Sequence, residues 1–117
     1  MVLNRKMIQE DYMSKSIEAR IQRLEDIEAI KQLKARYCAH CDNDYAPDAL
    51  AELFTEDAIW DGGVFGRHEG REAIREFFRS ASSMVDFALH EVMNPIIEVD
   101  GDCATGEWYL SCPMTFN

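Results

Sequence analysis

The sequence predicts an α+β domain in which helices come first and antiparallel strands follow. In residues 16–83, apolar side chains recur mainly at three- and four-residue steps, which is the spacing of helices. After Ser83 the chain becomes β-rich, with two runs joined by a turn. The chain has 117 residues, 47% of them hydrophobic, which suffices for one core and leaves no room for a second domain. This order favours helices packed on one side of an antiparallel sheet.

The first helix is predicted from Ser16, a suitable N-cap, through the stretch "SIEARIQRLEDIEAIKQLKARYCAHC". Its apolar stripe consists of Ile17, Ile21, Leu24, Ile27, Ile30, Leu33 and Tyr37. Residues 1–15 are mixed and polar, and we expect an N-terminal arm there. The domain itself is therefore expected over residues 16–117.

A second, short helix is expected to begin at Pro47, which suits a first helical turn, and to end near Phe54. The segment "DAIWDGGVFG" then reads as a strand entering a glycine turn. A third helix is expected over "GREAIREFFRSASS", and its inward-facing residues are Ile74, Phe77 and Phe78. His68 falls in a polar turn before this helix, where we expect a solvated side chain.

The segment "VDFALHEVMNPIIEVDGDCATGEWYL" predicts two strands joined by a turn at Asp100-Gly101-Asp102. Pro95 interrupts the first strand, which indicates a bulge or an edge at that point. Alternation places Ala88, His90, Val92 and Asn94 on one face of the first strand. On the second strand it groups Ala104, Gly106, Trp108, Leu110 and Cys112.

The composition excludes several functions. Twelve Lys and Arg against 22 Asp and Glu give a formal charge of −10, so nucleic acid and anionic membranes are poor partners. No apolar run approaches the ~18 residues of a membrane span, and the start lacks a signal peptide's apolar core. We therefore expect a cytoplasmic protein whose four cysteines are reduced thiols.

Four segments in order resemble the SnoaL-like branch of the nuclear-transport-factor-2-like superfamily: "RYCAHCD", "LAELFTEDAIWD", "GREAIREFF" and "HEVMNPIIEVDGDCATGEWYL". The resemblance covers about residues 17 to 114. It implies a curved antiparallel sheet wrapped by three N-terminal helices into a cone-like α+β barrel with a pocket inside. Relatives continue for about two more strands after the equivalent of Asn117, so the last strands are expected to be lacking. The exposed edge that results predicts a homodimer or a higher homo-oligomer.

Within this superfamily, the chain looks most like the group of scytalone dehydratase, bile-acid 7α-dehydratase and hexachlorocyclohexane dehydrochlorinase. The resemblance implies a catalytic trio of His90, Asp42 and Tyr37, without a metal or organic cofactor. Imidazole, with a pKa of ~6.5, suits removal of a proton from carbon, and a carboxylate can fix its tautomer. Tyr37 can donate a proton to a carbonyl or leaving oxygen. On an ideal helix, positions 37 and 42 differ by roughly 140°, so both can face one pocket only if the helix ends near 41.

The implied function is a lyase or isomerase, dehydratase-like, acting on a small hydrophobic and cyclic molecule. Trp60, Asn94 and Trp108 are candidates for its pocket wall. The alternative is a non-catalytic module of the same fold for ligand binding or oligomerisation. Cys38 and Cys41 have the spacing of half a zinc site, but the remaining cysteines, 103 and 112, should point to opposite faces of a strand. We therefore expect Cys38 and Cys41 to pack as small apolar groups.

Overall fold

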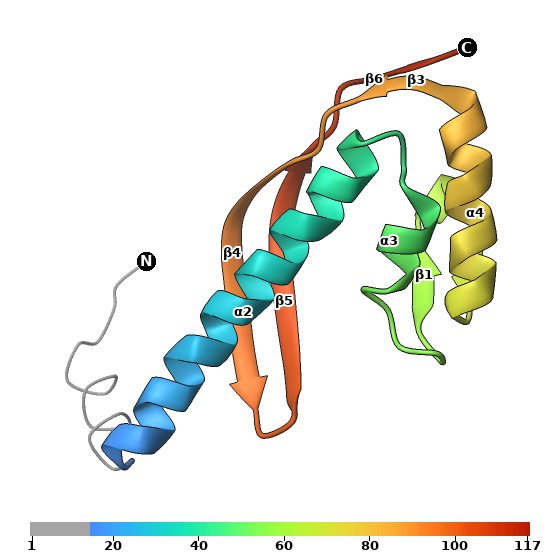
Figure 1. Ribbon diagram of the computed structural model, residues 1–117. Coiled ribbons are helices and arrows are strands. Elements are labelled where there is room, and N and C mark those ends of the chain that lie inside the picture. Colours follow the sequence, from blue (N-terminus) through green and yellow to red (C-terminus); the bar gives the residue numbers. More distant parts are fainter. Residues whose placement is uncertain (1–14) are drawn as a thin grey trace.

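The computed structural model describes residues 15–117, so the arm expected over residues 1–15 lies, except for Lys15, outside the described residues. One long helix, α2, runs beside the β4–β5 hairpin, while α3, α4 and β1 form a second group near its C-terminal end (Figure 1). The elements in chain order are α2 (Ile17–Asp42), α3 (Pro47–Ala51), β1 (Ile59–Asp61), the 3₁₀ turn η1 (Gly63–Phe65), β2 (Arg67–Glu69), α4 (Arg71–Met84), β3 (Val85–Ala88), β4 (Glu91–Asp100), β5 (Cys103–Ser111) and β6 (Met114–Phe116).

Helix α2 begins and ends close to the predicted residues. The side chain of Ser16 accepts a hydrogen bond from the N–H of Ala19 at 3.1 Å, which confirms the N-cap. The helix ends at Asp42, because the following turn takes Asp44 and Tyr45 to φ values of 54° and 47°. A helix cannot continue through such left-handed residues.

The buried core lies where the C-terminal end of α2 meets α3 and α4. Its largest fully buried side chains are Leu50, Ile74, Phe78 and Cys41. Ile74 and Phe78 confirm the predicted inner face of the third helix, and Phe77 packs at its border. The second helix is shorter than predicted, because the chain after Ala51 turns with hydrogen bonds to carbonyls three residues back, as from Phe54 to Ala51.

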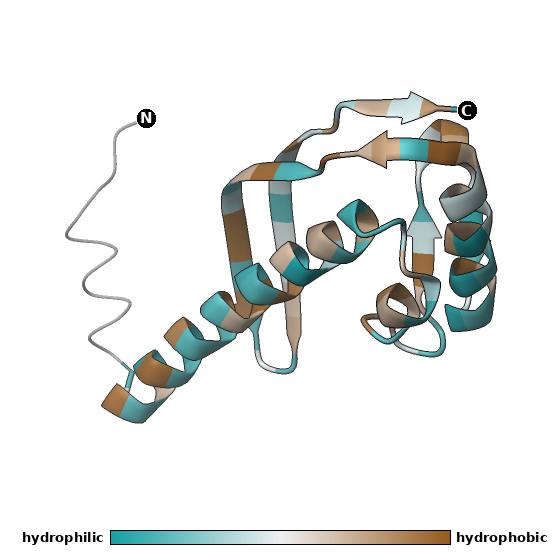
Figure 2. Cartoon of the chain, turned by 45° about the horizontal axis from the view of Figure 1, so that its top comes forward, coloured by the Kyte–Doolittle hydropathy of each residue, from teal (hydrophilic) through white to brown (hydrophobic). Residues whose placement is uncertain are grey.

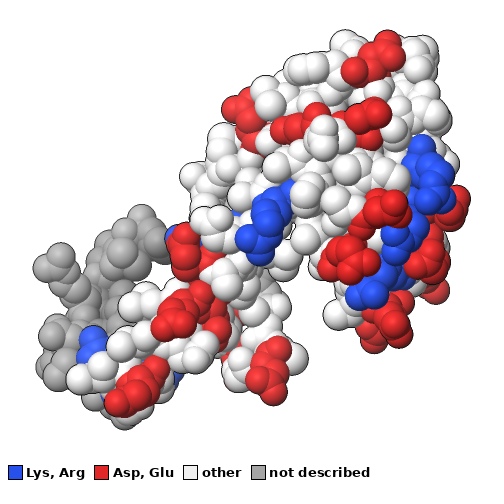
Figure 3. Space-filling model, viewed as in Figure 1, with Lys and Arg blue, Asp and Glu red and all other residues white. Residues whose placement is uncertain are grey.

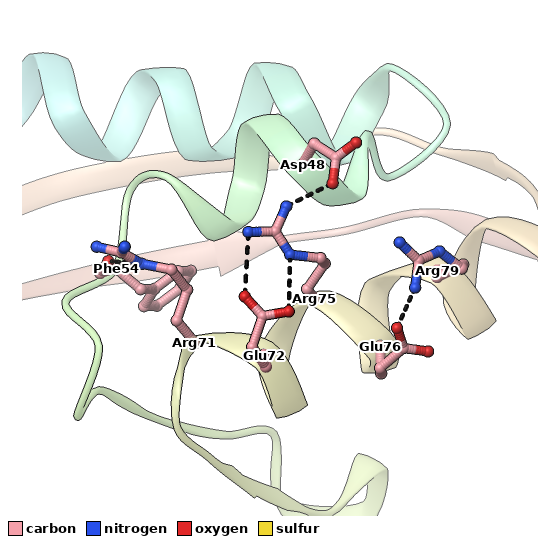
Figure 4. A network of polar contacts seen from close by, with 7 residues as sticks. All are labelled: Asp48, Phe54, Arg71, Glu72, Arg75, Glu76 and Arg79. Carbon is pink, nitrogen blue, oxygen red and sulfur yellow. Dashed lines mark hydrogen bonds and ion pairs between the residues drawn. The ribbon is translucent and has the colours of Figure 1, made fainter.

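Polar contacts on the outer side of α4 join it to α3 and to the segment that follows α3 (Figure 4). The Arg75 guanidinium bonds both Asp48 on α3 and Glu72 on its own helix. Arg71 Nε donates to the carbonyl of Phe54 at 2.8 Å. These contacts tie α4 to α3 and to the segment that follows α3.

The antiparallel strands form three two-stranded sheets, β1–β2, β3–β6 and β4–β5. The α+β class is confirmed, but the expected cone-like barrel is not closed in residues 15–117. Closure needs each strand to have a partner on both edges, and each strand described here has one. The β3–β6 and β4–β5 pairs follow one another, and the N–H of Leu89 bonds the carbonyl of Pro113 between them. They therefore form one long ribbon that is interrupted beside His90.

The predicted irregularity in β4 is a bulge. Met93 pairs with Tyr109 and Ile96 with Glu107, so the two residues between them on β4 oppose one residue on β5. Asn94 takes a φ of 54° there. The extra residue reverses the alternation of side chains, and the half-buried positions change from Val92 before the bulge to those at 97 and 99 after it.

The predicted turn between β4 and β5 is also confirmed. Asp100 pairs with Cys103, which leaves Gly101 and Asp102 as a two-residue loop. Gly101 has a φ of 59°, and glycine at the first loop position allows the tight hairpin turns that match strand twist.

Much apolar surface stays exposed away from the core, on the first turns of α2 and along β3 and β4 (Figure 2). Ile17 is 67% exposed and Leu24 63%, so the N-terminal part of the predicted apolar stripe does not pack. Acidic side chains are spread over the face shown in Figure 3, and basic ones gather among acids over α4. None of the helices in residues 15–117 combines the length and apolar character that a bilayer span requires.

Candidate active site

His90 and Asp42 are in direct contact. The ring Nδ1 of His90 lies 2.8 Å from Oδ1 of Asp42, and the backbone N–H of His90 donates to the same oxygen at 2.8 Å. Asp42 is the last residue of α2, and His90 lies in the interruption between β3 and β4, 48 positions later. One carboxylate oxygen thus holds both the backbone and the ring of His90.

This arrangement fixes the protonation pattern of the imidazole. A carboxylate oxygen only accepts, so Nδ1 carries the proton in the neutral ring and Nε2 keeps a free lone pair. The side chain of His90 is 10% exposed and that of Asp42 26%, so water has limited access to the pair. The pair has the geometry of a base and the carboxylate that orients it.

His90 lines a cavity of about 570 Å³ between the helices and the β ribbon. Tyr37 and Trp60 line the same cavity, while Asp42 lies behind the imidazole and does not. Positions 37 and 42 do not both have to face this cavity, because Tyr37 and His90 line it and Asp42 contacts the His90 ring. Further walls come from aromatic and aliphatic side chains, among them Tyr45, Phe77, Phe78, Leu110 and Met114.

Tyr37 is held as a neutral phenol. Its hydroxyl oxygen accepts a hydrogen bond from Nε1 of Trp60 at 2.9 Å. Burial raises the pKa of Tyr37 well above its ordinary value, and the neighbouring Cys41 adds to this effect. The indole only donates, and the side chain of Cys41 is a second hydrogen-bond partner of the same hydroxyl. Tyr37 lines the cavity and can offer its proton there when the hydroxyl turns away from Cys41.

The two cysteines of the first helix pack, as expected. Cys38 and Cys41 are buried, and burial raises the pKa of both thiols, that of Cys41 to about 12. Such thiols are protonated at neutral pH and are poor nucleophiles. In the described part of the chain, no group of three or more His, Cys, Asp or Glu side chains is arranged to hold a metal ion.

The three other residues predicted for the pocket wall do not line one cavity. Trp60 lines the cavity with His90, whereas Asn94 and Trp108 line a neighbouring groove of about 790 Å³ along the β4–β5 hairpin. His68 differs from the prediction of a solvated turn, because it lies on β2 and its ring stacks on Phe77 at 4.3 Å between centroids.

Two residues outside the predicted set also belong to the site. Tyr45 is buried, and its ring meets that of His90 edge-on at 5.8 Å. Its place depends on the left-handed turn after Asp42, for which we find no sequence signal. Lys34 lines both the cavity and the groove. Its spacing of three residues from Tyr37 places both on one side of the helix, but a lone charge at such a position does not by itself indicate a site.

The fold and the site define an α+β protein with a His–Asp pair in an apolar pocket between helices and antiparallel strands. Residues 22–116 match the SnoaL-like domain, and the chain belongs to this family. The family and the N-terminal helices with antiparallel sheets agree with the resemblance seen in the sequence.

Solved structures share this fold. An NTF2-like protein with a cystatin-like fold from Novosphingobium aromaticivorans is 30% identical, with a TM-score of 0.72 over 86% of this chain and 70% of that one. A protein assigned as a scytalone dehydratase from the same organism is 21% identical, with a TM-score of 0.73 over 80% of this chain and 63% of that one. A type 2 hexachlorocyclohexane dehydrochlorinase is 23% identical, with a TM-score of 0.74 over 83% and 66%.

The latter two show a likeness of fold alone. Across the three relatives, the chain spans between 63% and 70% of their length.

Proposed function

We propose that this protein is a cofactor-independent lyase that eliminates a leaving group from a small hydrophobic, cyclic molecule. Nε2 of His90 removes a proton from carbon, and the C–H electron pair forms the new double bond. The leaving group departs from the adjacent atom with its bonding electrons. Tyr37 supplies a proton when that group is an oxygen, and Asp42 stabilises the imidazolium that forms.

The observation that carries this proposal is the 2.8 Å contact between His90 Nδ1 and Asp42 at the wall of the cavity. A histidine that only fills space needs neither a carboxylate on one side of its ring nor an apolar cavity on the other. The names of two structural relatives, a dehydratase and a dehydrochlorinase, also denote eliminations. The volume of about 570 Å³ lies in the range of small-molecule sites, and the aromatic walls favour a ring compound.

The test uses 5-nitrobenzisoxazole, a flat apolar probe. A base removes the proton on C3 of the isoxazole ring, the C–H electron pair completes a nitrile, and the N–O bond breaks with its electrons on oxygen, which gives a coloured cyanonitrophenolate. This is the same elementary step as in the proposed reaction, and it needs no knowledge of the natural substrate. We expect His90→Ala to lower the protein-dependent rate by ~10²-fold or more, as loss of a general base does.

The matched control is His40→Ala, because His40 lies on the same helix as Tyr37 but does not line the cavity. It should keep the wild-type rate. If His90→Ala turns over the probe as fast as the wild type, His90 is not the base. The same result would favour a non-catalytic binding module.

The exposed outer strand favours a second role, in assembly. Tyr109 on β5 is 68% exposed and the neighbouring Leu110 60%, and β5 has one strand partner in the described residues. Such strands pair readily with a second copy. A dimer in sedimentation experiments that Tyr109→Lys dissociates would support this role, and a monomer at all concentrations would contradict it.

A further inference from the structure

Lys34 stands at the junction of the two hollows described above. The His90 cavity and the groove along the β4–β5 hairpin share three lining residues, Lys34, Val92 and Leu110. Among the residues that line either hollow, Lys34 is the one Lys or Arg in the described part of the chain. Any ligand that reaches from one hollow into the other passes its ammonium group.

The Lys34 side chain is held between aromatic rings. Its Nζ lies 4.6 Å from the ring centroid of Tyr37 and 5.6 Å from that of Trp108. These cation–π contacts position the ammonium group without using its hydrogen-bond donors. Within residues 15–117, no carboxylate forms an ion pair with it.

The acidic side chains that line the two hollows leave room for an anion beside Lys34. Asp61 lines the same cavity, but its carboxylate is paired with Arg67 at 3.8 Å. Glu107 lines the groove and not the cavity, so it disfavours an anion farther along the hairpin. The junction is therefore the place in the two hollows where a negative group meets a positive one.

We propose that Lys34 forms an anion subsite, and that the ligand of this protein is a ring compound carrying a carboxylate. The ring occupies the apolar cavity in front of His90, and the carboxylate bonds the Lys34 ammonium at the junction. The subsite adds a substrate class to the proposed function. Binding of the carboxylate at Lys34 does not depend on that function, whereas the reaction of the bound ligand does.

The test compares 2-naphthoate with 2-naphthamide, which have the same ring and differ in charge, by titration calorimetry. The wild type should bind the carboxylate about tenfold more tightly, as expected for one charge-assisted hydrogen bond in a partly buried site. Lys34→Met should remove this preference and leave the affinity for the amide unchanged. Lys34→Arg should keep it.

Two controls separate other sources of the effect. Lys31→Met removes an exposed positive charge from the same helix and should leave the preference intact. His90→Ala tests the other group in the cavity that can become positive, and it should also keep the preference. A loss of turnover with 5-nitrobenzisoxazole in His90→Ala, together with retained naphthoate binding, separates the base from the subsite.

Three outcomes overturn the assignment. The first is equal affinity of the wild type for the two ligands, which needs no variant. The second is naphthoate binding by Lys34→Met as tight as by the wild type, which would leave Lys34 as a cover for the Tyr37 and Trp108 rings. The third is failure of naphthoate to compete with 5-nitrobenzisoxazole, because the ligand would then bind elsewhere.

Discussion

Replacing Asp42 by alanine should destabilise the fold as well as the site. The substitution removes both hydrogen bonds to His90, one from the ring and one from the backbone N–H. A hydrogen bond to a charged group contributes about 1.5–3 kcal/mol, so the two together set a range of about 3–6 kcal/mol. The Asp42 side chain is 26% exposed, and water can replace part of what is lost. We therefore expect the free energy of unfolding to fall by about 3 kcal/mol.

The assay is urea unfolding followed by the fluorescence of Trp60 and Trp108. His90→Ala removes the ring but keeps the backbone N–H, so Asp42 retains one of its two bonds in that variant. A double-mutant cycle of Asp42→Ala and His90→Ala therefore isolates the ring bond, and we expect a coupling of about 1.5 kcal/mol or more. The remaining loss belongs to the backbone bond.

The control is Asp44→Ala, two residues along in the same turn, where the side chain is exposed. Asp44 has a φ of 54°, so alanine there adds some backbone strain of its own. A second control, Asp44→Asn, avoids this strain because asparagine tolerates the conformation, and it should be nearly neutral. A loss in Asp42→Ala no larger than in Asp44→Asn would refute the reasoning. A coupling near zero would show that the ring contact adds nothing to stability.

Three further predictions concern the core and the thiols. Phe78→Ala should cost about 3–5 kcal/mol in urea unfolding because it empties the centre of the core, whereas Val64→Ala, 97% exposed, should change little. Burial raises the pKa of Cys41 from 9.0 and of Tyr45 from 10.0 to about 12 each, so their contribution to stability is complete below pH 9 and lost as the pH rises toward 12. The melting temperature should fall over that range, and less steeply in Cys41→Ala. Under native conditions maleimide should label the exposed Cys103 before the buried Cys41, as peptide mass spectrometry can show.

The elements that local chemistry determines could be predicted from the sequence. The Ser16 cap, the periodicity of the first and third helices, and the Gly101 turn each depend on residues close together in the chain. The bulge in β4 followed from Pro95, which cannot donate to a strand partner. The structure places Tyr37 and His90 at one cavity and Asp42 in contact with His90, while a catalytic role of the three stays a prediction.

What could not be predicted depends on contacts between distant segments. The hydrogen bond from Trp60 to Tyr37 and the position of Tyr45 against His90 arise from how the turn after α2 meets the sheet. The division into three two-stranded sheets depends on backbone pairing that composition does not encode. The role of Lys34 could not be predicted, because a single charge on an apolar helix face indicates a solvated side chain unless the neighbouring groove is known.

The bulge at Asn94 has a consequence for how the gene tolerates small deletions. Loss of one codon at position 94 or 95 would leave one residue opposite Trp108, so the pairing would become regular while Ile97 and Val99 keep their partners Gly106 and Ala104 and their face. Loss of one codon at 97 or 98 would instead move the following residues of β4 by one position and turn Val99 to the opposite face. In-frame deletions should therefore be tolerated better at the bulge and at the Gly101–Asp102 loop than in the regular part of the strand between them.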